Sequence, residues 1–311
     1  MNNYPNVAIL LATYNGEKYL ECQIDSIFNQ IEVNCTLFIS DDSSQDKTVD
    51  IIKKYQKEFG IVNIILLDGP QKGHCANFLS LIERIPDDYD YYAYCDQDDY
   101  WKPDKLKSAI KILNSPEFYI SKIPLLYCGR TDYVDNKLNY ITKSPLFKYP
   151  PSFRNSIVQN IAGGNTMVFN VIAKINIKKS IFKNLITHDW WTYIVISACG
   201  GKVYYDPNSY VLYRQHSESI ISGNYKLSSK LNNIIDLFKG KNNSWNTVHV
   251  QALLNIFDML TFDNKSILLT FIKMRNSSIK HRFRMVEVCG LYRQTFKGTV
   301  MLYLAILINK I

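Results

Sequence analysis

The sequence predicts an α/β protein with a mainly parallel sheet flanked by helices, followed by a C-terminal helical extension. Three observations predict this fold. Short apolar runs alternate with segments of helical periodicity through the first hundred residues, which is typical of βαβ units. Acidic side chains directly follow two of the apolar runs. Beyond residue 223 the strand signals stop and the chain becomes basic.

The elements of the first half follow from the spacing of apolar residues. Short, mostly apolar runs predict buried strands at 7–12, 35–39, 62–67 and 91–94. Apolar residues three and four positions apart predict helices at 19–28, 48–59 and 76–85. Asp46 precedes the second helix and can cap it. Helices between successive strands imply that the strands run parallel.

The pattern changes after residue 102. Pro103 in a first turn predicts a helix that runs to Leu113. We then expect strands at 167–169 and 210–213 and a helix at 189–198. Further helices are predicted at 245–262, at 264–275 and, as one or two helices, at 282–308. We therefore expect an α/β domain over 1–222, with halves 1–101 and 102–222, and a mainly helical region over 223–311.

Composition excludes several classes of protein. The 311 residues are 47% hydrophobic and 21% charged, which excludes a disordered chain and a collagen-like fibre. Seven cysteines occur singly, without a CxxC pair, and the N-terminus lacks the features of a signal peptide. We therefore expect free thiols and a cytoplasmic protein.

The net charge of +8 is unevenly distributed. Residues 1–222 hold 23 Lys and Arg against 24 Asp and Glu, whereas residues 223–311 hold 13 against 4. A nucleic-acid-binding protein would not concentrate its cations in this way, so we expect no nucleic-acid partner.

The basic region ends in an apolar segment, 299–308, which is well short of the ~20 residues that span a bilayer. Between residues 273 and 297, seven cations face one anion, Glu287. This pattern predicts peripheral contact with the anionic inner face of a membrane. The alternative is a helix that packs on the α/β domain or on a second subunit of a homodimer.

The most informative segment is an acidic cluster, Asp96, Asp98 and Asp99, that directly follows an apolar strand. Ligands of parallel sheets bind beyond the carboxyl ends of the strands. Neighbouring carboxylates repel each other unless they are solvated or hold a cation, and Mg²⁺ prefers one or two carboxylates together with substrate phosphates. The cluster therefore predicts a metal site that carries a diphosphate. The alternative is an acidic surface turn in which Asp99 or Asp104 caps the next helix.

A second acidic pair, Asp41 and Asp42, follows the second strand in the same way. Asp42 can accept a hydrogen bond from the imide N–H of a uracil or thymine ring. The alternative is that the pair forms a helix-capping turn with Ser43 and Ser44.

The first strand leads into Tyr14 and Glu17. Tyr14 can lie against a base, and Glu17 can reach a ribose or a base. The alternative for Glu17 is a first-turn carboxylate that the helix dipole favours. Neither GxGxxG nor GxxxxGK[ST] is present, so the sequence has no dinucleotide fingerprint and no P-loop.

Three strings, ILLATYNGEKYL, LFISDDSSQDKT and YCDQDDYWKPDKL, resemble the nucleotide-sugar-binding half of glycosyltransferase family 2, which has the GT-A fold. The last string carries the DxD motif of that fold, and the resemblance covers roughly residues 5–222. One departure is Ser43, where the family usually has glycine, so the geometry of that turn is in question.

The resemblance implies inverting transfer of a sugar from a nucleoside diphosphate donor, with Mg²⁺ or Mn²⁺ bridging the diphosphate. Asp189, in the first turn of its helix, matches the base that takes a proton from the acceptor hydroxyl. Metal ligands are implied at Asp98 and His216. The implied donor contacts are Ala12, Tyr14, Glu17, Asp42, Asp96, Gly164 and Arg214.

Within the family, the spellings QDD-x-W, HDWW and YRQH look most like bacterial rhamnosyltransferases of surface polysaccharide assembly. That resemblance implies dTDP-L-rhamnose as donor and a glycan or lipid-linked glycan as acceptor. UDP-hexose and UDP-N-acetylhexosamine donors stay open. A sugar nucleotidyltransferase and a non-catalytic sugar-binding protein are the other candidates, although TYNGEKYL lacks the glycine-rich basic loop that usually marks the former.

Overall fold

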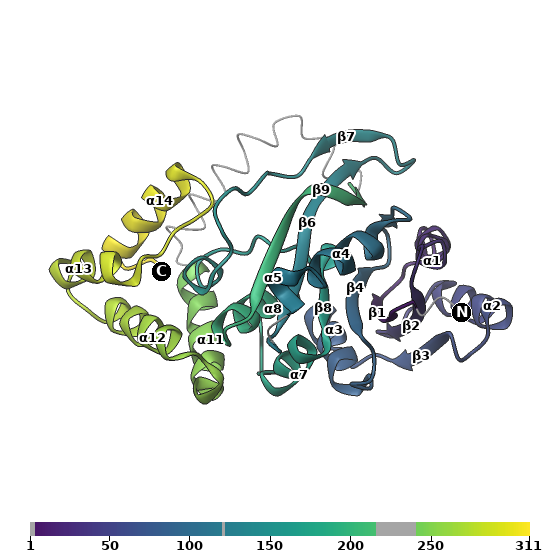
Figure 1. Ribbon diagram of the computed structural model, residues 1–311, viewed down its shortest axis with the longest axis horizontal. Coiled ribbons are helices and arrows are strands. Elements are labelled where there is room, and N and C mark those ends of the chain that lie inside the picture. The colour runs from purple at the N-terminus through teal and green to yellow at the C-terminus, as the bar shows by residue number, and fades with distance from the viewer. Residues whose placement is uncertain (1–3, 120–121, 216–240) are drawn as a thin grey trace.

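The protein is built on one nine-stranded sheet with the strand order β3-β2-β1-β4-β8-β6-β9-β5, with β7 paired to β6 (Figure 1). The computed structural model describes residues 4–119, 122–215 and 241–311. Helices flank both faces of the sheet, and a group of helices from the C-terminal part of the chain lies at the end away from β3 (Figure 1). The α/β prediction with C-terminal helices is therefore confirmed.

The first four strands are parallel, as predicted. Each predicted strand and helix of this half is present, with bounds that differ by a few residues. The strands are β1 (Asn6–Thr13), β2 (Asn34–Asp41), β3 (Ile64–Asp68) and β4 (Tyr91–Asp96), and the helices are α1 (Leu20–Phe28), α2 (Thr48–Phe59) and α3 (His74–Arg84).

The second half makes the sheet mixed. Its β8 is antiparallel to both β4 and β6, whereas β6 and β9 are parallel to each other. The strands are β5 (Tyr100–Trp101), β6 (Leu125–Val134), β7 (Tyr140–Lys143), β8 (Val168–Asn170) and β9 (Lys202–Arg214). The helices are α4 (Lys105–Leu113), α5 (Pro116–Tyr119), α6 (Phe153–Ser156), the 3₁₀ turn η1 (Gly164–Thr166), α7 (Val171–Lys179) and α8 (His188–Ala198).

The sheet separates two apolar cores, as a strand buried on both faces requires. Along β1, Val7, Ile9 and Leu11 pack against α1, α2 and α4 on one face. Ala8 and Leu10 pack on the other face, in the core that includes α3, α7 and α8. Successive side chains of β1 therefore lie alternately in the two cores.

The C-terminal part of the structure is helical, and the predicted segment 282–308 forms two helices. The elements are α11 (Lys241–Asn255), the 3₁₀ turn η2 (Phe257–Met259), α12 (Phe262–Arg275), α13 (Ile279–Cys289) and α14 (Phe296–Leu307). Among the described residues, every helix is too short or too polar to cross a bilayer. The predicted boundary at residue 222 lies outside the described ranges.

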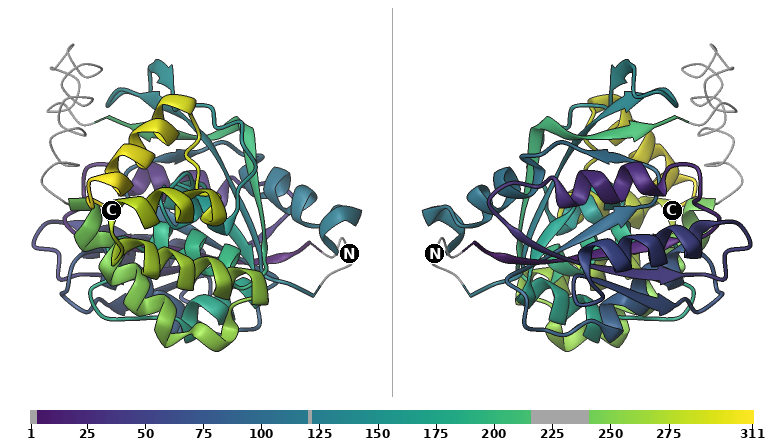
Figure 2. Two further views of the ribbon diagram at one scale, coloured as in Figure 1. Left: turned by 90° about the vertical axis from the view of Figure 1, so that its left-hand side faces the viewer. Right: turned by 90° about the vertical axis from the view of Figure 1, so that its right-hand side faces the viewer.

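The loop between α13 and α14 ties these helices to the sheet domain. The side chain of Gln294 donates to the carbonyl of Tyr149 at 2.9 Å and accepts from its N–H at 2.9 Å. The Gln294 N–H donates to Gln159 Oε1 at 2.8 Å, and Asn155 donates to the carbonyl of Tyr292 at 3.0 Å. Figure 2 shows α12, α13 and α14 together on one side of the molecule. The C-terminal helices are thus hydrogen-bonded to segment 149–160.

Gln294→Ala should lower the free energy of unfolding by about 1–3 kcal/mol, because it removes two hydrogen bonds between the buried Gln294 side chain and the Tyr149 backbone, each worth about 0.5–1.5 kcal/mol. Urea denaturation followed by circular dichroism measures this change. Lys297→Ala, three residues away and exposed, is the control and should stay within about 0.5 kcal/mol of the parent. Equal stability of the two variants would show that the Gln294 bonds do not hold the C-terminal helices.

Candidate active site

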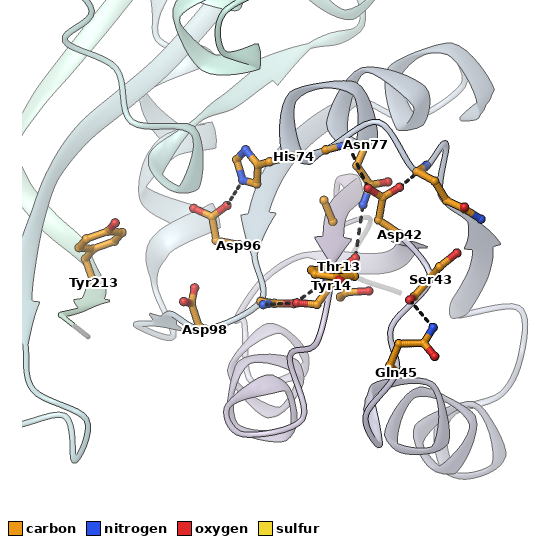
Figure 3. A pocket seen from close by; sticks show the side chains of 14 residues that line it. Thr13, Tyr14, Asp42, Ser43, Gln45, His74, Asn77, Asp96, Asp98 and Tyr213 are labelled. Carbon is orange, nitrogen blue, oxygen red and sulfur yellow. Dashed lines mark hydrogen bonds and ion pairs between the residues drawn. The ribbon is translucent and has the colours of Figure 1, made fainter. Parts of the chain in front are cut away.

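A cavity of about 800 Å³ opens at the carboxyl ends of β1, β2 and β4 (Figure 3). Register brings these ends together, because Thr13 pairs with Asp41 and Ala12 pairs with Asp96. The chain runs from β1 outward to β2 and β3, and then returns to place β4 on the other side of β1. Such a reversal of strand order is where open α/β sheets bind ligands. Of the predicted site residues, Ala12, Tyr14, Asp42, Asp96 and Asp98 line this cavity.

The two carboxylates after β2 have different surroundings. Asp41 is buried and accepts from Thr13 Oγ1 at 2.9 Å and from the N–H of Ser44 at 2.9 Å, so it closes the turn. Asp42 faces the cavity, where the backbone N–H groups of Gln71 and Gly73 donate to it at 2.5 and 3.2 Å. Asp41 thus takes part in the predicted turn. The predicted contact of Asp42 with a nucleoside base stays a prediction.

Ser43, between these residues and Ser44, adopts a φ of 69°. This is the left-handed region, which favours glycine. Asp41 closes the turn around Ser43, because it accepts from both the N–H and the hydroxyl of Ser44.

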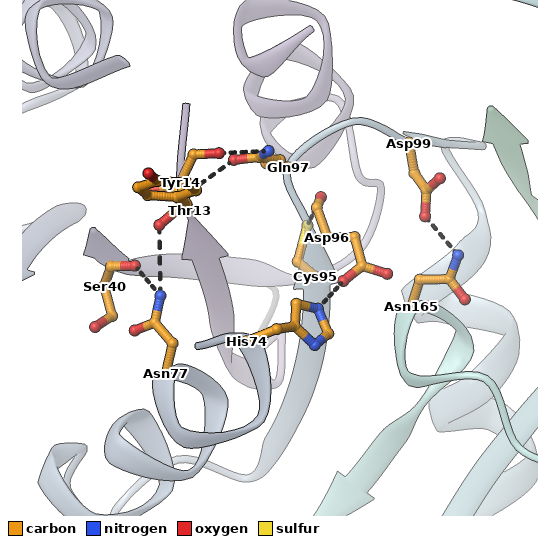
Figure 4. Close-up of polar contacts among 10 residues, drawn as sticks. All are labelled: Thr13, Tyr14, Ser40, His74, Asn77, Cys95, Asp96, Gln97, Asp99 and Asn165. Atoms are coloured by element: carbon orange, nitrogen blue, oxygen red, sulfur yellow. Dashed lines mark hydrogen bonds and ion pairs between the residues drawn. The ribbon is translucent and has the colours of Figure 1, made fainter. Parts of the chain in front are cut away.

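The loop after β1 is fixed to the acidic cluster by one amide side chain (Figure 4). Gln97 accepts from the N–H of Tyr14 at 2.9 Å and donates to its carbonyl at 3.1 Å. The ring of Tyr14 stays exposed at the cavity wall. Glu17 is not among the residues that line the cavity. Its carboxylate accepts from the N–H of Lys47 at 3.0 Å, just before α2, so its predicted nucleoside contact stays untested.

Asp96 and Asp98 project toward the cavity from the end of β4 (Figure 3). His74, at the start of α3, lies 3.4 Å from Asp96 through its Nε2 atom, and this hydrogen bond raises the pKa of His74. Within the described ranges, no three His, Cys, Asp or Glu side chains are grouped to hold a metal alone. Mg²⁺ usually takes only one or two carboxylates and completes its shell with phosphates. The carboxylates of Asp96 and Asp98 therefore fit a divalent cation that also binds the phosphates of a donor.

Asp99, the third member of the acidic cluster, is fully buried. It accepts from Asn165 Nδ2 at 2.5 Å (Figure 4). Burial, together with the charges of Asp96 and Asp98, raises the pKa of Asp99 well above its usual range. Asp99 thus joins the acidic loop to η1.

A second cavity of about 390 Å³ contains the predicted base, Asp189. Asp189 accepts from Asn160 Nδ2 at 3.0 Å and from the N–H of Trp190 at 2.6 Å. Asp96 and Tyr213 line both cavities, so the two spaces adjoin across these side chains. The predicted residues Asp42, Asp98 and Asp189 therefore line two adjoining cavities and not separate surfaces.

Gly164 lines the second cavity beside Asp189. A Cβ at this position would lie 2.6 Å from Nε2 of His188 and 3.4 Å from the Cβ of Asp189. His188 is buried between aromatic rings, with a ring centroid 3.9 Å from that of Phe78, and burial lowers the pKa of His188 to about 3. A neutral imidazole therefore sits behind the glycine.

The predicted residue Arg214, at the end of β9, does not line either of these two cavities. The buried guanidinium of Arg214 donates to the carbonyl of Asn136 at 2.7 Å and lies 4.6 Å from the ring centroid of Tyr19. The predicted phosphate contact would require this side chain to leave that position, and it stays untested. His216 lies outside the described residues.

Sequence reasoning missed His74, Asn160 and Tyr213. His74 had a signal, because it follows β3 at the same sheet edge and starts a helix. Tyr213 lies next to Arg214 in a strand, where successive side chains point to opposite faces. Asn160 lies outside any helix or strand and had no local signal. Trp191, two residues after Asp189 on α8, is buried, and its indole N–H donates to Ser180 at 3.0 Å.

Gly164→Ala should destabilise the protein by about 1–3 kcal/mol, because the added methyl group forces His188 or Asp189 to move in a packed site. Gly163→Ala is the control, since its Cβ would meet only the Asn165 side chain, at 3.2 Å. Urea denaturation of both variants measures the difference. A Gly164→Ala variant no less stable than Gly163→Ala would contradict the close approach.

Comparison with known proteins agrees with this geometry. The model of glycosyl transferase family 2 matches residues 8–175. The dTDP-rhamnosyl transferase RfbG of Shigella flexneri is 33% identical over 232 residues, which cover 71% of this chain and 76% of RfbG. The putative teichuronic acid biosynthesis glycosyltransferase TuaG of Bacillus subtilis is 30% identical over 114 residues, 36% of this chain and 44% of TuaG.

Solved structures share the architecture at low sequence identity. The S. aureus TarS structure in complex with UDP has a TM-score of 0.56 at 15% identity, over 87% of this chain and 71% of that chain. The mannosyltransferase PcManGT from Pyrobaculum calidifontis, in complex with GDP-Man and Mn²⁺, has a TM-score of 0.50 at 14% identity, over 99% and 86% of the two chains. These likenesses show the fold, and the family match shows the lineage. The chain belongs to glycosyltransferase family 2 and is a glycosyltransferase with the GT-A fold.

Proposed function

We propose that the protein transfers a sugar, with inversion, from a nucleoside diphosphate donor to a glycan or lipid-linked glycan of a bacterial surface polysaccharide. The observation that carries this proposal is the pair of adjoining cavities that share Asp96 and Tyr213. One cavity has carboxylates where a diphosphate with its cation can lie, and the other holds Asp189 where an acceptor hydroxyl can arrive.

Within the first cavity, we assign the nucleoside to Ala12, Tyr14 and Asp42. The Asp42 carboxylate is held in place by two backbone N–H groups, and its remaining lone pairs can accept from a pyrimidine imide. Asp98, with Asp96 beside it, would hold Mg²⁺ or Mn²⁺. Bound there, the cation would neutralise charge that develops on the departing diphosphate.

L-Rhamnose from dTDP-L-rhamnose is our first choice of donor. Its support is the 33% identity to RfbG, which is named a dTDP-rhamnosyl transferase. Donors that carry UDP are the alternative, and the TarS structure with UDP shares only the fold at 15% identity. The sugar would lie near Gly164, where the absence of a side chain leaves room beside Asp189.

Asp189 acts as the base in this proposal. An acceptor hydroxyl attacks the anomeric carbon from the face opposite the diphosphate, and Asp189 takes the hydroxyl proton as the new bond forms. Asn160 and the Trp190 N–H orient its two carboxylate oxygens. Since Asp189 lines the second cavity and not the first, its removal should impair transfer and leave donor binding intact.

Asp189→Asn should lower turnover by about 10²- to 10⁴-fold, because the amide keeps the shape but cannot take the proton. Release of nucleoside diphosphate measures turnover, and calorimetry should show a donor Kd within about twofold of the parent. Asp263→Asn, the same change in the first turn of α12, is the control and should be fully active. Undiminished turnover of Asp189→Asn would exclude this residue as the base.

A panel of dTDP-, UDP- and GDP-sugars with Mn²⁺ should identify the donor through thermal stabilisation, with dTDP-L-rhamnose giving the largest shift. A ligand at 100 times its Kd adds about 2.7 kcal/mol. Asp98→Ala should abolish the Mn²⁺-dependent part of the shift, whereas the exposed Asp88→Ala should preserve it. An unchanged shift in Asp98→Ala would refute the metal assignment, and release of pyrophosphate from a nucleoside triphosphate would favour a nucleotidyltransferase.

We place this reaction in the cytoplasm, at the inner face of the cell membrane. The support is that all seven cysteines are free thiols, which is typical of a reducing compartment. The cation excess over residues 223–311 adds an attraction to anionic lipid. A lipid-linked acceptor would be met at the same place.

A further inference from the structure

One face of α14 is apolar although it is exposed. Phe296, Val300, Leu304 and Ile308 recur every fourth residue, and all four are exposed, Phe296 by 78%. The opposite face of the helix carries Leu302 and Ile306, which are buried in the core. A helix at a water-facing surface normally places polar residues on its outer face. This stripe therefore calls for an apolar partner.

The neighbouring helix also exposes apolar side chains. On α13, Ile279, Phe283 and Val288 are 59%, 62% and 68% exposed. Arg282 on α13 donates to the carbonyl of Leu307, at the end of α14, at 3.1 Å, which fixes the two helices to each other. Figure 1 shows α13 and α14 next to each other at the end of the molecule away from β3.

The same two helices are strongly basic. Lys280, Arg284 and Lys297 are exposed, and Glu287 is the one acidic residue between positions 279 and 311. In the ranges that the structure describes, none of these three cations is in an ion pair. Exposed apolar side chains flanked by unpaired cations are the pattern of a surface that lies on anionic lipid.

We propose that α13 and α14 form the membrane-docking surface of the protein, with Phe283, Phe296, Val300 and Leu304 entering the interface of an anionic leaflet and Lys280, Arg284 and Lys297 lying among its headgroups. A second copy of the chain is a poorer occupant, because a two-fold interface would bring the same cations against each other. The proposal rests on the membrane location proposed above and not on the sugar that is transferred.

This surface is connected to the proposed acceptor cavity. The loop between α13 and α14 binds segment 149–160 through Gln294 and Tyr292. Asn160, at the end of that segment, donates to Asp189. Docking on α13 and α14 would therefore hold the segment that orients Asp189 in a fixed position relative to the lipid surface.

Co-sedimentation of the full chain with vesicles tests the surface. The parent should bind phosphatidylcholine vesicles that contain 30% phosphatidylglycerol at least tenfold more tightly than pure phosphatidylcholine vesicles. Binding should weaken as salt rises, since screening confines the attraction to about 8 Å at 0.15 M. Each cation near the surface adds roughly fivefold in affinity, so the triple variant Lys280→Glu, Arg284→Glu, Lys297→Glu should lose at least tenfold.

Two controls match the variants. Lys53→Glu, Lys57→Glu, Lys111→Glu changes the net charge equally on other exposed surfaces and should keep most of the binding. Phe296→Ser with Leu304→Ser should lose at least tenfold, whereas Val62→Ser, which is 75% exposed in the first half, should not. An unchanged melting temperature and donor affinity show that each variant is folded and separate this test from that of the transfer reaction.

Equal binding of the two triple variants would overturn the proposal, as would the absence of binding to anionic vesicles. A dimer in sedimentation velocity that Phe296→Ser with Leu304→Ser dissociates would assign the stripe to a second copy instead.

Discussion

Parallel strands that exchange hydrogen bonds must end at a shared edge, and this constraint places Thr13, Asp41 and Asp96 side by side in three neighbouring strands. Carboxylates so close to each other need compensation. The chain provides it locally: a hydroxyl and an N–H for Asp41, two backbone N–H groups for Asp42, and an imidazole for Asp96. The cavity, the carboxylate pair Asp96 and Asp98, and the link from Asp99 to η1 all depend on this edge.

Periodicity was sufficient to predict the first half of the fold. Strands buried on both faces produce unbroken apolar runs, so β1 to β4 could be located from sequence. In the second half, β9 was predicted only at 210–213, whereas it runs from Lys202 to Arg214. Its register with β6 shifts between Asp206 and Ser209, which leaves Pro207 and Asn208 unpaired. Proline in a strand is tolerated at such a bulge, and it concealed the longer strand.

The sequence predicted site residues where several acidic side chains follow one another directly, as at Asp96 and Asp98, which line the first cavity. It was less predictable where orientation decides the role. Tyr213 and Arg214 are neighbours on β9, and the strand period of two sends only one of them toward the cavities. The sequence does not show which of the two faces the cavities. The guanidinium of Arg214 was chosen because it can bind a phosphate. Asn160 reaches Asp189 through the packing of segment 149–160 on α8, where the Trp190 indole donates to the carbonyl of Ser156 at 2.7 Å and the Tyr193 hydroxyl donates to Asn155 at 2.9 Å.

Asp96 and Tyr213 stand between the two cavities and line both of them. A molecule that fills the larger cavity would therefore touch side chains that also bound the smaller one. Any change that one occupant makes in these two side chains would alter the affinity for the other occupant, and thermodynamic linkage makes such an effect reciprocal.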